Sequence, residues 1–155
     1  MKKINNLLAE YGESHQNSQN EAIHWICVPS IFFSIMGILY AIKLPIVINN
    51  HFQLNIALIA MVFVIIYYLT LSLTLTVGML IFSGLCLSLC YFLEGNFSFP
   101  LWGICLIVFT LAWIGQFIGH KIEGKKPSFF RDIQFLLIGP AWLISFIYAR
   151  IGIRI

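Results

Sequence analysis

Residues 52–93 read FQLNIALIAMVFVIIYYLTLSLTLTVGMLIFSGLCLSLCYFL and contain no charged side chain. A helix needs about 20 apolar residues to cross a bilayer, so this run is long enough for two crossings. Its least apolar part is the hydroxyl-rich stretch TLSLTLT at residues 70–76. We therefore predict a tight hairpin there, between one helix at residues 53–71 and a second at residues 76–93.

Three more uncharged runs flank this hairpin, at residues 25–42, 95–119 and 133–149. None alternates with the period of two that a barrel strand would show, so their backbone amides have to be satisfied within helices. They predict membrane helices at residues 25–42, 100–119 and 133–149. We expect the last to be kinked, broken or re-entrant at Gly139-Pro140, because a proline removes one helix hydrogen bond.

The composition also indicates a membrane protein. Of the 155 residues, 60% are hydrophobic and 10% are charged, whereas soluble domains are about 45–50% apolar and about 25% charged. The mean hydropathy is +0.92. The excess apolar surface requires lipid, which excludes a soluble enzyme and a disordered chain, and 9 basic against 6 acidic residues exclude a nucleic-acid binder. The four cysteines lie inside apolar runs, so we expect thiols and not disulfides.

The predicted fold class is therefore all-α, a polytopic membrane helix bundle of about five transmembrane segments. We expect one domain over residues 1–155. It consists of a polar segment at residues 1–24, the helix bundle at residues 25–149 and a short tail at residues 150–155. The first segment has no continuous apolar stretch, so we expect no cleaved signal peptide.

Most of the charge lies in two polar segments, residues 1–24 and 120–132. Because loops rich in Lys and Arg stay in the cytoplasm, we expect both on the cytoplasmic side of the membrane. That membrane would be the inner membrane of a bacterium or the endoplasmic reticulum of a eukaryote. Lys43, Arg150 and Arg154 fit this orientation less well, since the predicted topology leaves them outside.

The first polar segment carries two of the four histidines, His15 and His24. Residues 18–21, SQNE, match a capping box, in which a hydroxyl and a carboxylate satisfy the amides that open a helix. A helix that begins there places Asn20 and His24 four residues apart, on one face. An interruption of the helix at Asn17-Ser18 would let the preceding segment fold back, which would bring His15 towards that face. The alternative is an amphipathic interfacial stretch without a site.

The second polar segment begins at the end of the fourth predicted helix, where residues 113–127 read WIGQFIGHKIEGKKP. On a helix, Gln116, His120 and Glu123 form one stripe at spacings of four and three. Polar groups inside a membrane span are costly and usually face a cavity or a functional site. The alternative is a helix end that interfacial polar groups cap.

The topology brings three histidines to one membrane boundary. Imidazole and carboxylate groups bind iron, zinc or manganese, and two His with one carboxylate are the signature of non-haem Fe(II) oxygenases. Three His suit a catalytic Zn²⁺ equally well. His51 lies in the loop predicted on the opposite side, and we expect it to be solvated. We predict that the metal ligands are His15, His24 and His120. Glu123 either binds the metal or supports a ligand, and Asn20 and Gln116 orient the ligands.

Two blocks of this sequence resemble the membrane 2-hydroxy fatty acid dioxygenase family, HQNSQNEAIH at residues 15–24 and WIGQFIGHKIEGKKP at residues 113–127. The resemblance runs from about Tyr11 to Gly152 and matches the spacing of both blocks. It implies a membrane-embedded, Fe(II)-dependent dioxygenase that uses O₂ to shorten a 2-hydroxy fatty acid by its carboxyl carbon, in fatty-acid α-oxidation. The six candidate residues occupy the matching positions.

The sequence departs from the family at one position. An acidic residue often lies six positions after the last proline, where this chain has Phe146.

A metal above an apolar helix bundle suits, on chemical grounds alone, a substrate with a polar head and an alkyl tail. Lys121, Lys125 or Lys126 could attract the carboxylate of such a substrate. The alternatives are a zinc-dependent lipid hydrolase and a non-catalytic transporter or scaffold, although the chain shows no internal repeat and no charge in the middle of its spans.

Overall fold

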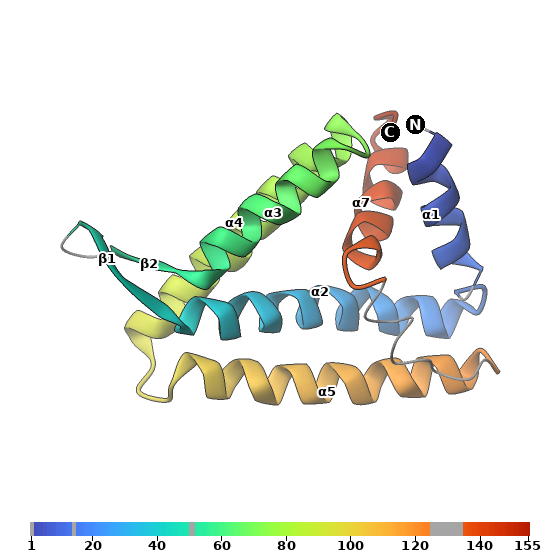
Figure 1. Ribbon diagram of the computed structural model, residues 1–155. Coiled ribbons are helices and arrows are strands. Elements are labelled where there is room, and N and C mark those ends of the chain that lie inside the picture. The colour runs from blue at the N-terminus through green and yellow to red at the C-terminus, as the bar shows by residue number, and fades with distance from the viewer. Residues whose placement is uncertain (1, 14, 50–51, 125–134) are drawn as a thin grey trace.

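The computed structural model describes residues 2–13, 15–49, 52–124 and 135–155. It is mostly helical, as predicted, and it also contains one short β-hairpin. In chain order its elements are α1 (Lys2–Gly12), α2 (Ser18–Ala41), β1 (Lys43–Asn49), β2 (Phe52–Asn55), α3 (Ile56–Leu69), α4 (Leu73–Asn96), α5 (Leu101–Ile122) and α7 (Ile138–Arg150). Figure 1 shows α2 and α5 side by side and antiparallel, with the α3–α4 hairpin at an angle to them. α1 and α7 lie across the end where α2 begins.

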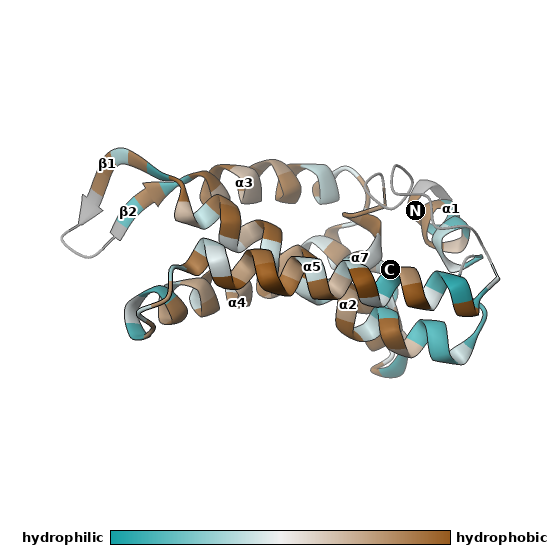
Figure 2. Ribbon diagram, turned by 90° about the horizontal axis from the view of Figure 1, so that it is seen from below, coloured by the Kyte–Doolittle hydropathy of each residue, from teal (hydrophilic) through white to brown (hydrophobic). Residues whose placement is uncertain are grey.

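Three of the described helices, α2, α4 and α5, are long and apolar enough to cross a membrane. Many large apolar side chains on these helices are exposed, as lipid-facing side chains are, and polar residues gather where α2 begins and α5 ends (Figure 2). α3 has 14 residues and α7 has 13. At 1.5 Å per residue these helices measure about 21 Å and about 20 Å, against about 30 Å of hydrocarbon. Five full crossings are therefore not confirmed.

The predicted helix hairpin at residues 70–76 is confirmed, because the chain turns there between α3 and α4. Two phenol hydroxyls tie this turn to α7. Tyr68 donates a hydrogen bond to Leu137 O. Tyr148 donates to Thr74 O at 3.0 Å. The main apolar core lies between this hairpin and α2 and includes Phe32, Met36, Tyr68, Leu75 and Met79.

The opposite end of the bundle carries a feature that the sequence analysis missed, a two-stranded antiparallel hairpin of β1 and β2 (Figure 1). Lys43 at its base forms an ion pair with Glu94 of α4, Nζ to Oε2 at 2.8 Å. The same ammonium lies 3.7 Å from the centroid of the Tyr40 ring. The charge of Lys43, which fitted the predicted orientation poorly, is therefore compensated by a carboxylate at the same end.

Pro140 lies in the first turn of α7. Because α7 begins at Ile138, the missing amide of Pro140 would have no helical partner there. Pro140 therefore does not kink α7, and the 13 residues of α7 are too few to span the bilayer. α7 runs antiparallel to α1 and ends with Arg150 near the start of α4, at the opposite end from the Lys43–Glu94 pair (Figure 1).

α2 and α5 approach closely because small residues lie between them. A Cβ added to Gly119 would lie 2.4 Å from Asn20 Oδ1, and one added to Gly115 would lie 2.6 Å from Cys27 Sγ. Gly115 and Gly119 form a GxxxG pattern, which lets membrane helices meet without side-chain bulk between them. This contact holds the polar start of α2 against the polar end of α5.

Candidate metal centre

Three histidines from distant parts of the sequence meet at this polar end. His15 lies between α1 and α2, His24 lies on the second turn of α2, and His120 lies in the last turn of α5. Their side chains are 6%, 1% and 5% exposed, respectively. One ring nitrogen from each can serve as a ligand atom, and these atoms all lie within 4.8 Å of one another. The structure thus brings together the three histidines that the sequence analysis placed at one membrane boundary.

Backbone carbonyls fix the orientation of two of these rings. His15 Nδ1 lies 2.7 Å from Tyr11 O, and His24 Nδ1 lies 2.9 Å from Asn20 O. A carbonyl oxygen only accepts, so Nδ1 carries the proton in each ring and Nε2 carries the lone pair. Histidines that bind metals usually show this arrangement, in which a hydrogen bond to the second nitrogen sets the tautomer.

The local sequence explains how His15 reaches α2. Asn17 is the N-cap of α2, and its side chain accepts from Gln19 N at 2.9 Å. The capping box predicted at Ser18 is therefore wrong by one residue, because the Asn17 oxygen caps the helix and Ser18 is already helical. The predicted break before α2 is confirmed, and it places the His15 ring centroid 4.2 Å from that of His24.

Glu123 follows α5 directly and binds the start of α2. Its Oε1 accepts from Gln16 N at 2.9 Å. Its Oε2 accepts from Asn17 N at 2.9 Å and from Asn20 Nδ2 at 3.0 Å. Partial burial raises the pKa of the Glu123 carboxyl, but these hydrogen bonds outweigh that effect, and the pKa lies below its ordinary value. We predicted that Glu123 either binds the metal or holds a metal ligand in place. This geometry favours the second role, because both carboxylate oxygens accept hydrogen bonds from α2 and its N-cap loop.

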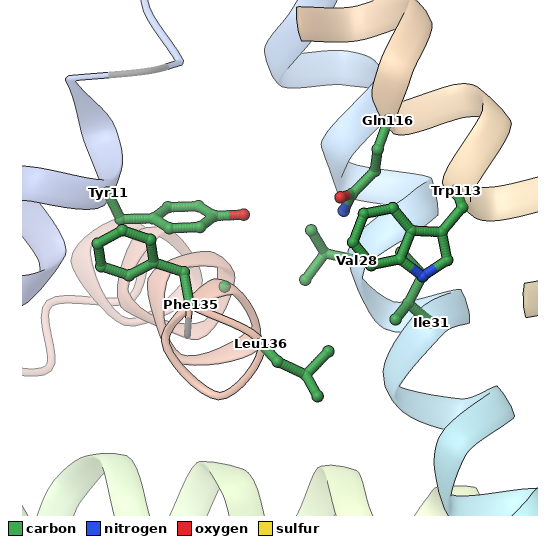
Figure 3. Close-up of a pocket in the computed structure, with 8 residues that line it drawn as sticks. Tyr11, Val28, Ile31, Trp113, Gln116, Phe135 and Leu136 are labelled. Atoms are coloured by element: carbon green, nitrogen blue, oxygen red, sulfur yellow. The ribbon is translucent and has the colours of Figure 1, made fainter. Parts of the chain in front are cut away.

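The two predicted orienting residues have different surroundings. Asn20 is fully buried and links His24 to Glu123, because its carbonyl accepts from the imidazole and its side-chain amide donates to the carboxylate. Gln116 is buried one turn before His120 and lines a pocket between α2, α5 and α7 (Figure 3). Asn20 therefore supports the histidines, whereas Gln116 faces space that a ligand can fill.

The sequence analysis missed two aromatic residues that surround His15. The Tyr11 ring stacks on the His15 ring, with centroids 4.4 Å apart and an interplanar angle of 17°. The ring of Trp142, on α7, lies 5.3 Å from the same imidazole. The four-residue spacing from Tyr11 to His15 could have indicated that these rings are neighbours, and the GxxxG pattern at Gly115 and Gly119 could have indicated the contact between α2 and α5. No sequence pattern indicated Trp142, because only the packing of α7 brings it here.

Other residues named in the sequence analysis do not join the cluster. Lys121 is exposed on α5. Lys125, Lys126 and His51 lie outside the described residues. Phe146, at the position where the family often has an acid, is 37% exposed on α7, so the departure from the family pattern is an apolar ring at the protein surface.

The chain is similar to proteins of one family. A family model described as "2-hydroxy-palmitic acid dioxygenase Mpo1-like" matches residues 1–151. The 2-hydroxy-palmitic acid dioxygenase MPO1 of Saccharomyces cerevisiae is 26% identical over 149 residues, which cover 94% of this chain and 79% of the yeast protein. No solved structure matches the chain significantly. Because the family model covers nearly the whole chain, including all three clustered histidines, this protein belongs to the Mpo1-like family.

Proposed function

We propose that this protein is an Fe(II)-dependent dioxygenase that shortens a 2-hydroxy fatty acid by its carboxyl carbon. The observation that carries the proposal is the buried cluster of His15, His24 and His120, whose ligand atoms lie within 4.8 Å of one another. The name of the yeast relative, a 2-hydroxy-palmitic acid dioxygenase, supports the reaction type and the substrate class.

The donor set fits a divalent transition metal. In two of the rings Nδ1 bonds to a carbonyl, so Nε2 is the atom that would bind the metal. Three imidazoles would leave coordination positions open for the substrate head and for O₂. Oxygenation is a redox reaction and zinc has no redox chemistry, so iron is the metal that we propose. Bound iron would supply the activation of O₂.

The proposed reaction balances without an added reductant. One O₂ and one 2-hydroxy acid give a fatty acid one carbon shorter, CO₂ and water. The bond between the carboxyl carbon and carbon 2 breaks, and carbon 2 becomes the new carboxyl carbon. The electrons that these two carbons lose reduce O₂, so no organic cofactor is required.

The protein's own residues would position the reactants. The carboxylate and hydroxyl of the substrate belong at the polar end of the bundle, and the alkyl chain belongs among apolar side chains. The histidine cluster lies beside the start of α2 and the end of α5, and the rest of both helices is predominantly apolar. The rings of Tyr11 and Trp142 pack against His15 and limit the access of water to it.

Anaerobic purification followed by metal analysis, and then by addition of O₂ and 2-hydroxypalmitate, tests the proposal. We expect bound iron, oxygen consumption and pentadecanoic acid as the product. His24→Ala should lose iron and turnover together, because it removes one predicted ligand. His51→Ala is the matched control, since the sequence analysis places that histidine at the opposite end, and it should retain both.

Four results would contradict the proposal or part of it. Product formation without O₂, or dependence on Zn²⁺ in place of iron, would favour the zinc-dependent lipid hydrolase. Protein with neither metal nor turnover would favour the transporter or scaffold. Full iron occupancy in His24→Ala would remove that residue from the ligand set.

A further inference from the structure

A pocket lies beside the histidine cluster (Figure 3). Val28 on α2 and Gln116 on α5 form part of one wall, and Tyr11 on α1 and Gly139 on α7 lie opposite. The pocket therefore lies between two layers, the α2–α5 pair and the α1–α7 pair. Its place in the fold connects it with the cluster, because Tyr11 also stacks on His15.

On α2 and α5 the residues that line the pocket lie one to two helical turns from the histidines, on the side of the apolar part of the bundle. On α2, Val28 follows His24 by one helical turn. On α5, Gln116 and Trp113 precede His120 by one and two turns. At a rise of 1.5 Å per residue, Trp113 lies about 10 Å along the helix from His120. A molecule whose head is at the histidines can therefore extend into the pocket.

The polar groups of the pocket and its apolar groups are separated. In Figure 3 the Tyr11 hydroxyl points across the pocket towards the side-chain amide of Gln116. Ile31 and Leu136 line the pocket away from this pair. A ligand that matches this arrangement has a polar head and an apolar body.

The absence of a side chain at Gly139 keeps the pocket wide. A Cβ at this position would lie 3.0 Å from Tyr11 Oη and 3.0 Å from Val28 Cγ1. Both distances are shorter than ordinary van der Waals contact, and both partner residues line the pocket. Even one methyl group would therefore narrow the space between the two layers.

We propose that this pocket binds the first carbons of the substrate's alkyl chain, that Gln116 and the Tyr11 hydroxyl contact its polar head, and that Leu136 and Gly139 determine which chains fit. The identity of the head group rests on the function proposed above. The position of the chain rests on the pocket alone, so the two can be tested separately.

Anaerobic binding of a series of acids, from 2-hydroxybutyrate to 2-hydroxyoctanoate, measures chain binding without turnover. Burial of each methylene should raise the affinity of the unaltered protein about fourfold. Leu136→Trp should fill the pocket and Gly139→Ala should narrow it, so both should flatten this dependence on chain length. Neither change removes a proposed metal ligand, so the metal content should stay unchanged.

Leu111→Trp and Gly84→Ala are the matched controls. Leu111 is 63% exposed, and a Cβ added to Gly84 meets nothing within 4 Å. Both controls should keep the chain-length dependence of the unaltered protein. An unchanged dependence in both pocket variants, or an equal loss in the controls, would overturn the proposal. If turnover is absent but the pocket variants still flatten the dependence, the proposed function fails while the pocket assignment stands.

A fatty acid that carries a diazirine near its carboxyl end provides a measurement on the unaltered protein, in case the variants do not fold. We expect photochemical crosslinks to residues 28–31 and 113–116, which belong to the two helices that form the pocket wall. Crosslinks confined to the exposed apolar side chains of α4 would overturn the assignment.

Discussion

Glu123→Gln keeps the size of the side chain and removes its charge. The carboxylate accepts three hydrogen bonds from the start of α2, from Gln16 N, Asn17 N and Asn20 Nδ2. Glutamine has one acceptor oxygen. If that oxygen takes the place of Oε2 it keeps two of the three bonds, and its NH₂ group then faces the Gln16 amide, which is also a donor.

The expected cost follows from the bond that is lost. A hydrogen bond to a charged acceptor contributes about 1.5–3 kcal/mol, and partial exposure of Glu123 reduces this to about 1–2 kcal/mol. Asn20, which bonds to Glu123, also holds His24 through its carbonyl. A change of about 1.4 kcal/mol is tenfold in an equilibrium constant. We therefore expect metal affinity to fall about tenfold, within the range typical of groups that support metal ligands.

An anaerobic titration with Fe(II), or with Co(II) as a spectroscopic probe, against a competing chelator measures this affinity. Glu94→Gln is the matched control, because it makes the same chemical change in the ion pair with Lys43 at the other end of the bundle. It should leave metal affinity unchanged. Equal affinity in Glu123→Gln and the unaltered protein, or an equal loss in the control, would refute the reasoning. Complete loss of metal binding would indicate that Glu123 is itself a ligand.

The lowered pKa of Glu123 adds a second measurement to the same variant. A carboxyl whose pKa is lower in the folded than in the unfolded state stabilises the fold above its unfolded value of about 4.3. That contribution is lost as the pH falls through the folded pKa. We would measure the unfolding free energies of the unaltered protein and of Glu123→Gln without metal. The difference between them should be constant near neutral pH and should shrink as the pH falls below about 4.3. A difference that grows on acidification would contradict this sign.

Two further predictions concern the helix contact and the orientation. Gly119→Ala places a Cβ 2.4 Å from Asn20 Oδ1, so it should lower the free energy of unfolding by about 1–3 kcal/mol and reduce metal content. Gly84→Ala, in open space, should do neither when both are compared by denaturant unfolding and metal analysis. Cysteines introduced at the exposed residues Ser18 and Asn96 should react with an impermeant reagent from the cytoplasmic and the opposite side, respectively. Labelling of both from the same side would contradict the proposed topology.

The sequence predicted the features that depend on local composition. The uncharged run at residues 52–93 required helices, since no other single-pass backbone is satisfied in lipid. The hydroxyl-rich stretch within it marked the turn. The same topology placed residues 1–24 and 120–132 at one end. The hydrogen bonds that Gln16 N and Asn17 N donate to Glu123 confirm this for the described parts of the two segments.

Predictions that depended on exact boundaries were less successful. Pro140 disfavours a helix interior but suits a first turn, and the sequence did not show where α7 begins. The choice of Asn17 over Ser18 as the N-cap depends on which residue takes the extended backbone, and both side chains can cap a helix. The sequence analysis placed residues 43–52 in a loop and residues 53–55 at the start of a helix, so the β-hairpin was missed.

Only the tertiary structure showed what each polar group of the site contacts. Sequence spacing placed Glu123 on the stripe of His120 but could not show that its oxygens bond to Asn17 and Asn20. The stacking of Tyr11 on His15 and the pocket beside them depend on α1 and α7, which pack across the end of the bundle. Periodicity within one helix determines which side chains share a face. Contacts between helices depend on distances of a few ångströms, which arise only when the helices pack.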